Sequence, residues 1–247
     1  MANLVIDIGN TFTKVAVFKQ DELLWTNHYK SVDNSFADAI IDQYQINQAI
    51  ISTVKKAVEG WQPILAEKIP VIYFNRQMAA GINNLYRTPQ TLGLDRLAAV
   101  IGAVKCFPSQ NNLVIDAGTC ITYEWVDKYA NYYGGSISPG ISMRYKAMNA
   151  FTEGLPLVEK NEQADLDYGD DTISAMRSGV QTGIKYEVTG FIDHFIKQDN
   201  EINVILTGGD GIFLYTLLKN SIFAPYIKNE PYLVLKGLNA AIQEHND

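Results

Sequence analysis

Two short stretches of this chain place a carboxylate and a glycine directly after an apolar run. The first reads LVIDIGNT and contains Asp7 and Gly9, and the second, 109 residues later, reads LVIDAGTC and contains Asp116 and Gly118. Turns of this composition can direct backbone N–H groups and hydroxyls at phosphate oxygens. A carboxylate beside a triphosphate is repulsive unless a cation lies between them, so the paired acids indicate Mg²⁺. The repeat therefore predicts two sides of one phosphate-binding cleft, with Asp7 and Asp116 facing each other.

The usual phosphate-binding signatures do not occur in the sequence. Neither G-x-x-x-x-G-K-[ST] nor G-x-G-x-x-G is found, so a nucleotide would have to be held by another device. The first repeat offers Asn10 and Thr11 in its turn and Lys14 on the outgoing strand, within reach of the same phosphates. The alternative is that both repeats are ordinary hairpins whose Asp and Asn serve turn geometry. The duplicated spacing favours the phosphate site.

A third stretch, VILTGGDG at residues 204–211, runs from an apolar strand through two glycines into a helix. Gly208 and Gly209 would let a flat ligand such as an adenine-ribose unit approach the backbone near a helix N-terminus. The alternative is a plain strand-to-helix turn in which Asp210 caps the helix.

A fourth stretch, residues 88–103, reads TPQTLGLDRLAAVIGA and combines a glycine, an acid and a base at a helix start. Gly93 permits close approach, Asp95 could accept a proton from a substrate hydroxyl, and Arg96 offers a planar fork for a carboxylate or a phosphate. The alternative is that Asp95 only caps the helix of residues 96–107 and that Arg96 is solvated. The position at a helix start fits both interpretations.

The elements that must position these residues follow one order twice. Apolar alternation and helical spacing predict βββαβαβ in the first half, with an antiparallel meander at its start, and the same outline in the second half. In the first half we expect strands at residues 4–7, 13–18, 23–29, 48–54 and 71–74, and helices at 36–44, around 61–65 and at 95–107. In the second half we expect strands at residues 113–116, 121–126, 132–136, 204–206 and 232–235, and helices at 143–150, 172–196, 211–219 and 237–243.

The duplication and the length of 247 residues favour two α/β domains. We expect them to span residues 1–112 and 113–247, with a hinge at the polar SQNN segment of residues 109–112. The first domain would then carry the first repeat and residues 88–103, and the second domain would carry the other two motifs.

The composition limits the classes of partner. A net charge of −7 and a pI near 5.0 argue against general nucleic-acid binding, which needs a basic surface. We see neither a secretory leader pattern nor an apolar run near the ~18 residues of a membrane helix, so we expect a cytoplasmic protein with no membrane partner. Cys106 and Cys120 lack CxxC spacing and are expected to be buried free thiols, and the three histidines form no metal-ligand pattern.

Together these stretches resemble the type III pantothenate kinases, a branch of the superfamily of acetate and sugar kinases, heat-shock chaperones and actin. The superfamily is indicated by Asp-Ile-Gly-Asn-Thr-x-x-Lys at residues 7–14, Asp-Ala-Gly-Thr at 116–119 and Thr-Gly-Gly-Asp at 207–210. The branch is indicated by Tyr86-x-x-Pro89-x-x-x-Gly93-Leu94-Asp95-Arg96, Gly134-Gly135, Pro139-Gly140 and Thr172-x-x-Ala175. The resemblance implies two duplicated ribonuclease H-like domains, the actin-like ATPase fold, flanking an ATP cleft.

The resemblance also implies roles for single residues. In this family the Gly-x-Asp-Arg segment binds pantothenate and its aspartate is the catalytic base, so Asp95 inherits that role. Asp116 matches an acid that holds a monovalent cation, K⁺ or NH₄⁺, and Asp7 is expected to hold Mg²⁺ through water. The implied ATP-binding residues are Asp7, Ile8, Gly9, Asn10, Thr11, Phe12, Thr13, Lys14, Gly118, Thr119, Gly208 and Gly209. The implied pantothenate-binding residues are Tyr86, Gly93, Leu94, Asp95, Arg96 and Thr172.

The resemblance implies ATP-dependent phosphorylation of pantothenate to 4′-phosphopantothenate, the first step of coenzyme A biosynthesis, by a homodimer. Arg96 could bind the pantothenate carboxylate or support the transferring phosphate. Two alternatives stay open. Another small-molecule kinase or phosphatase of the superfamily would share the acid motifs but has no reason to keep Tyr86 and residues 93–96 at this spacing. The second alternative is a non-catalytic regulator, because some relatives were first described as accessory factors for gene expression.

Overall fold

The computed structural model of the chain describes residues 2–55, 57–161 and 167–245. They form two compact units. The first comprises Met1–Ser109, Lys128–Tyr133 and Tyr232–Asp247, and the second comprises Gln110–Asp127 and Gly134–Pro231. The first division, after Ser109, lies close to the expected one at residue 112. The units nevertheless differ from the expected ranges 1–112 and 113–247, because the C-terminal segment packs with the first unit.

Five strands of the first unit form one mixed sheet: β1 (Ala2–Ile8), β2 (Thr13–Lys19), β3 (Glu22–Tyr29), β4 (Ile46–Thr53) and β5 (Val71–Tyr73). Their order in the sheet is β3-β2-β1-β4-β5. The first three strands make the predicted antiparallel meander, whereas β4 runs parallel to β1 and β5 parallel to β4. Short turns join the antiparallel strands, and a helix precedes each parallel one, as parallel pairing requires a crossover.

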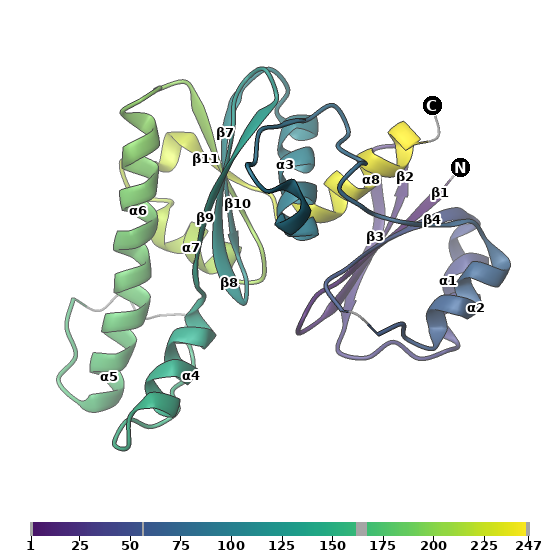
Figure 1. Cartoon of the computed structure of the whole chain (residues 1–247). Coiled ribbons are helices and arrows are strands. Elements are labelled where there is room, and N and C mark those ends of the chain that lie inside the picture. Colours follow the sequence, from purple (N-terminus) through teal and green to yellow (C-terminus); the bar gives the residue numbers. More distant parts are fainter. Residues whose placement is uncertain (1, 56, 162–166, 246–247) are drawn as a thin grey trace. The chain divides into compact units, whose positions relative to one another are not determined.

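One face of this sheet is covered by α1 (Phe36–Tyr44) and α2 (Trp61–Lys68), which lie side by side in Figure 1. Alternate residues of β1, namely Leu4, Ile6 and Ile8, belong to the apolar core that these helices close. Because successive strand residues point to opposite faces, Asn3, Val5 and Asp7 face the other side of the sheet.

That other side is covered by α8 (Leu233–His245) and α3 (Leu94–Cys106), which also pack on each other. Their contact depends on two glycines. A Cβ on Gly237 would lie 1.8 Å from the Ala98 carbonyl oxygen, and a Cβ on Gly102 would lie 2.3 Å from the Leu233 carbonyl oxygen. Asn3 donates to Asn239 of α8 at 3.0 Å. The C-terminal helix is therefore a structural layer of the first unit.

The second sheet has six strands among the described residues, and five of them repeat the pattern of the first: β7 (Asn111–Ala117), β8 (Cys120–Val126), β9 (Asn131–Pro139), β10 (Ile202–Thr207) and β11 (Ile227–Asn229). Their order is β11-β10-β7-β8-β9, which is the order of the first sheet read from the opposite edge. β8 is antiparallel to β7, and β10 is parallel to both β7 and β11. The repeated topology confirms the duplicated α/β fold.

The second unit also contains α4 (Ile141–Phe151), α5 (Thr172–Arg177), α6 (Gly183–Ile196) and α7 (Gly211–Leu218). Buried residues of these helices form one core with β7, β8 and β10. Between α5 and α6, Ser178–Thr182 forms a π-helical turn. The predicted helix of residues 172–196 is thus confirmed as one helical run with a local widening. No helix within the described residues is long and apolar enough to cross a membrane.

The predicted strand at residues 232–235 is wrong. Leu233–Leu235 begin α8, because Leu235, Leu238 and Ile242 follow helical spacing and are all buried. The fifth strand of the second sheet is β11 instead. Only three residues long and with Ile227 as its single buried residue, it leaves almost no periodic signal in the sequence. A second short strand, β6 (Asn83–Asn84), pairs with the first two residues of β9 within the first unit.

Candidate functional site

Asp7 lies near the carboxyl end of β1, on the sheet face that α3 and α8 cover, and is 8% exposed. In the antiparallel pairing it stands opposite Lys14 on β2, and in the parallel pairing it stands beside Ser52 on β4. In-register neighbours share a sheet face. The carboxylate is therefore flanked by an amine side chain on one side and a hydroxyl on the other, and two of the predicted ATP-binding residues stand together.

The turn between β1 and β2 presents the rest of the first motif. The Gly9 N–H donates to the Phe12 carbonyl oxygen at 3.0 Å, which closes a tight loop. The tip residues 10–12 are exposed, whereas Ile8 and Thr13 are buried in the flanking strands. Side chains at the tip are thus open to a ligand, while Ile8, a member of the core, can offer a nucleotide only its backbone.

Tyr86 and Arg96, both expected to bind pantothenate, are in contact. The guanidinium carbon of Arg96 lies 5.4 Å from the centre of the Tyr86 ring, a cation–π distance. Tyr86 in turn stacks parallel to Tyr132, with ring centres 6.3 Å apart. Arg96 is only 6% exposed. The interpretation of Arg96 as a solvated surface residue is therefore wrong.

Asp95 lies in the first turn of α3, which starts at Leu94 after the N-cap residue Gly93. Its Oδ1 accepts the backbone N–H of Arg96 at 2.9 Å, so it satisfies one of the N–H groups that a helix start leaves free. A Cβ on Gly93 would lie 2.5 Å from the same oxygen, and Asp95 is partly exposed. The carboxylate can therefore stabilise the helix start and still meet a substrate.

Asp116 occupies the equivalent place in the second unit, near the end of β7. It is in register with Thr122 on β8 and with Thr207 on β10. Gly208 follows with a φ of 89°, and a Cβ on it would lie 2.3 Å from Asp116 Oδ1. No described atom lies within 4 Å of a Cβ built on Gly209. The second acid is thus in contact with Gly208 of the third motif, and there is open space at the Cβ position of Gly209.

The turn that follows Asp116 is supported from α4. The Gly118 N–H donates to the Cys120 carbonyl oxygen at 2.9 Å, and the Gly140 N–H donates to the Thr119 carbonyl oxygen at 3.1 Å. A Cβ on Gly140 would lie 2.2 Å from the Gly118 carbonyl oxygen. The Pro139-Gly140 pair therefore fixes the turn that carries Gly118 and Thr119.

Asp210 is the N-cap residue of α7, but its side chain makes no capping hydrogen bond. Its Oδ1 pairs with Lys160 Nζ at 2.8 Å, and the same amine lies 5.3 Å from the centre of the Phe213 ring. Asp210 therefore stands at the N-cap of a strand-to-helix turn, as expected, but its side chain does not cap the helix. Lys160 is a cation beside the third motif that the sequence pattern did not indicate.

A polar network joins β8, α4 and α6, and the sequence pattern did not reveal it. Tyr123 Oη donates to Glu187 Oε1 at 2.7 Å, while Arg144 forms an ion pair with Glu187 Oε2 and donates to the Pro139 carbonyl oxygen at 2.8 Å. Burial raises the pKa of Glu187, but hydrogen bonds from Arg144, Tyr123 and Ser138 outweigh it, and the pKa lies below its ordinary value. Burial and the bond to Glu187 raise the pKa of Tyr123 well above the usual range.

Thr172 is the first residue of α5 and is exposed. The residue before it, Asp171, caps this helix by accepting the Ser174 N–H at 2.9 Å. Thr172 belongs to the second unit, whereas Tyr86 and Arg96 belong to the first. Its role toward pantothenate stays a prediction.

Within the described ranges, no three His, Cys, Asp or Glu side chains gather into a potential metal site. A cation at Asp7 or Asp116 would therefore need ligands other than a cluster of these side chains, and hard cations readily take phosphate, water and backbone oxygens. Neither Cys106 nor Cys120 forms a disulfide in the described part of the chain, and each is partly exposed, so the expectation of buried thiols is wrong.

The chain matches the family model of the type III pantothenate kinases over residues 3–194. A type III pantothenate kinase from Bacteroides fragilis strain YCH46 is 42% identical over 248 residues, covering 99% of this chain and 98% of the relative. A Campylobacter jejuni protein assigned to the Baf family of transcriptional activators has a similar structure, with a TM-score of 0.60, 22% identity and 98% coverage of both chains. A Listeria monocytogenes protein assigned as an N-acetylmannosamine kinase aligns over 100% of both chains, with a TM-score of 0.54 and 14% identity. These structural likenesses show the actin-like ATPase and sugar kinase fold, and the sequence matches show that the chain belongs to the type III pantothenate kinase family.

Proposed function

We propose that this chain is an ATP:pantothenate 4′-phosphotransferase, which transfers the γ-phosphoryl group of ATP to the primary hydroxyl of pantothenate in the first step of coenzyme A biosynthesis. Family membership is the observation that carries the proposal, since the similarity to a named pantothenate kinase extends over nearly the whole chain. The packed cluster of Tyr86 with Arg96 supports it, because this segment carries the family's pantothenate motif.

On the ATP side, we assign the phosphates to the β1–β2 turn with Lys14 and to the Gly118–Thr119 turn. The exposed turn tip and the amine opposite Asp7 support the first assignment. The open space above Gly209 supports adenosine binding at that glycine. Phosphoryl transfer depends mostly on positioning and charge neutralisation, which backbone N–H groups and a lysine can supply without covalent chemistry.

The surroundings of Asp7 fit a divalent cation, in our proposal Mg²⁺. Asp7 is a nearly buried carboxylate, and the buried hydroxyl of Ser52 beside it has no hydrogen-bond partner within the described part of the chain. Mg²⁺ usually keeps several waters and takes one or two carboxylates together with substrate phosphates. One acid reached through water is therefore enough, and the bound ion would offset the negative charge of the phosphates.

We propose that Asp116 holds a monovalent cation, K⁺ or NH₄⁺. A Cβ on Gly208 would lie 2.3 Å from Asp116 Oδ1 and 2.4 Å from the Ala117 carbonyl oxygen. Because Gly208 has no side chain, these two oxygens border the same space, and oxygen ligands of this kind suit a hard cation. A side chain at position 208 would fill this place.

On the acceptor side, Asp95 orients the pantothenate hydroxyl and takes its proton. General-base catalysis of this kind typically contributes about 10²- to 10⁴-fold in rate. Gly93 leaves room for the carboxylate, and Tyr86 holds the Arg96 side chain in place. Arg96 would bind either the pantothenate carboxylate or the transferring phosphate, and Thr172 would contribute a further pantothenate contact. We also propose that the enzyme is a cytoplasmic homodimer.

The test is coupled ADP release from ATP and Mg²⁺, with and without pantothenate, in K⁺, in NH₄⁺ and in neither. We expect ADP production that requires both pantothenate and one of the monovalent cations. Pantothenate-independent turnover with another acceptor would favour a different kinase of the superfamily. No turnover in any condition, with intact ATP binding, would favour a non-catalytic regulator.

A further inference from the structure

Ser52 is a buried hydroxyl without an evident structural role. It is 1% exposed, and its Oγ has no hydrogen-bond partner among the residues that the structure describes. Leaving a buried hydroxyl unpaired is unfavourable, because the group loses water and gains nothing in return. Alanine could occupy the same strand position without that penalty. The presence of a hydroxyl here therefore needs an explanation other than folding stability.

The position of Ser52 places this hydroxyl beside the acid of the first phosphate motif. Ser52 is the in-register neighbour of Asp7 in the parallel pairing of β4 with β1. Lys14 is the neighbour of Asp7 on the other side. The three side chains therefore form a row across three strands, on the face that α8 covers and on which α3 contacts β4. Asp95 stands in the first turn of that helix.

The second unit contains the same arrangement. Asp116 on β7 has Thr207 as its in-register neighbour on the parallel strand β10. Thr207 is also 1% exposed. In both units, then, a buried hydroxyl residue lies at or next to the end of the fourth strand and stands beside an acid near the end of the first strand. The hydroxyl, like the acid, is therefore repeated on equivalent strands of the two units.

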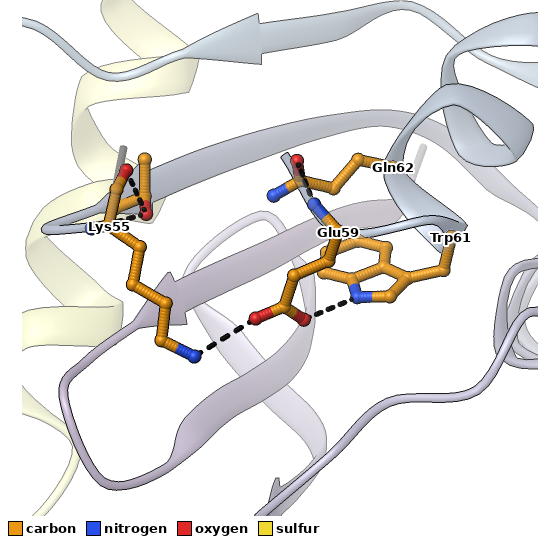
Figure 2. Close-up of polar contacts among 5 residues, drawn as sticks. Lys55, Glu59, Trp61 and Gln62 are labelled. Atoms are coloured by element: carbon orange, nitrogen blue, oxygen red, sulfur yellow. Dashed lines mark hydrogen bonds and ion pairs between the residues drawn. The ribbon is translucent and has the colours of Figure 1, made fainter. Parts of the chain in front are cut away.

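Hydrogen bonds connect the strand end that carries Ser52 to neighbouring elements. The Val54 N–H donates to the Ile8 carbonyl oxygen at 3.2 Å, which ties the end of β4 to the end of β1. Beyond it, Figure 2 shows Lys55 and Trp61 converging on the carboxylate of Glu59, at 3.0 Å and 2.8 Å. These bonds connect the end of β4, which carries Ser52, to β1 and to the start of α2.

We propose that Ser52 is a positioning residue for the divalent cation that arrives with ATP, acting through Asp7. A hydroxyl donates one hydrogen bond and accepts others. In the loaded site, Ser52 Oγ donates to the Asp7 carboxylate and accepts from a cation-bound water, and so gains the partners that it lacks without ligand. The inference rests on the proposed binding of ATP and its cation at Asp7.

The experiment compares Ser52→Ala with the unchanged chain by calorimetric titration with ATP, once in Mg²⁺ and once in a chelator. The measured quantity is the factor by which Mg²⁺ tightens ATP binding. We expect Ser52→Ala to reduce this factor about tenfold, as for the loss of a hydrogen bond to a charged group, while ATP affinity in the chelator stays the same. The unfolding midpoint without ligand should stay the same or rise, because an unpaired buried group is removed.

Two variants serve as controls. Ser52→Thr keeps a hydroxyl, as Thr207 does, and should retain most of the Mg²⁺ effect. Thr26→Ala removes a hydroxyl that donates to the Val15 carbonyl oxygen at 3.0 Å on the same sheet, and should lower the unfolding midpoint without changing the Mg²⁺ effect. The inference would be overturned if Ser52→Ala left the Mg²⁺ effect on ATP binding unchanged. It would also be overturned if this variant lowered the unfolding midpoint and weakened ATP binding equally in Mg²⁺ and in the chelator. Because the readout is ATP binding, failure of pantothenate phosphorylation would be seen separately.

Discussion

At the scale of single residues, Asp95 combines helix stabilisation with the proposed acceptance of a proton. Asparagine has nearly the same shape and keeps an oxygen that can accept the Arg96 N–H, but it cannot act as a base. We expect Asp95→Asn to lower kcat by about 10²- to 10⁴-fold and to leave pantothenate binding and the unfolding midpoint almost unchanged. Coupled ADP release and calorimetric titration measure the two effects. Near-normal kcat would remove Asp95 from the mechanism.

The two glycines of the third motif provide a matched pair of variants. Gly208→Ala would force a side chain into a positive φ of 89° and against Asp116 Oδ1 at 2.3 Å, so we expect a lower unfolding midpoint and loss of ATP binding. Gly209→Ala meets no described atom within 4 Å, so it should fold normally and weaken only ATP binding. Thermal unfolding and ATP titration distinguish these outcomes. Equal midpoints for the two variants would contradict the packing of Gly208 against the acid.

At the scale of elements, Glu187 ties α6 to α4 and to β8. Its pKa in the folded chain is lower than its ordinary value of 4.5, so its contribution to stability is complete above 4.5 and is lost as the pH falls through the lower folded value. We expect Glu187→Gln to lower the free energy of unfolding by about 1.5 kcal/mol at neutral pH, and the difference to shrink in acid. Denaturant titrations of both proteins, from neutral pH to below 4.5, measure this difference in the free energy of unfolding.

Asp193 provides the control on the same helix. It pairs with Lys197 one turn later at 2.6 Å, and both side chains are exposed. Exposed pairs of this kind contribute little, so Asp193→Asn should change stability only slightly at any pH. A pH-independent difference between Glu187→Gln and the unchanged chain would show that the network acts through shape and not through charge.

The crossing of α3 and α8 allows no side chain at its closest point. We expect Gly237→Ala to destabilise the first unit by about 1–3 kcal/mol, because the new Cβ would lie 1.8 Å from the Ala98 carbonyl oxygen. Gly190, in the interior of α6 with no described atom near its Cβ position, should tolerate alanine and gain about 1 kcal/mol from helix propensity. Thermal unfolding compares the two. Similar unfolding midpoints for Gly237→Ala and Gly190→Ala would contradict the close contact between α3 and α8.

Much of the secondary structure could be predicted from local pattern. The apolar alternation of residues 13–18 and the helical spacing of residues 36–44 each define an element without help from the rest of the chain. The run from Leu233 to Leu235 is different, because three consecutive apolar residues fit a strand or a buried helix equally well. Packing against α3 decides between them, and no local pattern contains that contact.

The residues of the candidate site also fall into two groups, those that a local sequence pattern indicates and those that it does not. Asp7, Asp116 and Asp95 stand in recognisable motifs, so their residue types and spacing were enough to single them out. Ser52 and Lys160 carry no such signal, because their importance depends on neighbours 45 and 50 residues away. Long-range partners are set by topology, which short sequence patterns do not encode.

At the scale of the whole molecule, family resemblance predicts a homodimer. We expect light scattering to give a mass of about twice the 27.5 kDa of one chain, unchanged across dilution in the micromolar range. A mass equal to one chain would contradict the predicted assembly while leaving the assignments of the ATP-binding turns intact.

The first unit cannot complete its core until late in translation. Its sheet uses residues 2–73, but α8, which supplies the buried Leu235, Leu238 and Ile242, is made only after almost all of the second unit. Since nascent chains fold as they emerge, the second unit can close its core before the first, against the usual order. Until then the side of β1 and β4 that α8 covers, which includes Val5 and Ile50, lacks that cover. We therefore expect the unfinished first unit to be open to aggregation and to chaperones until α8 is made.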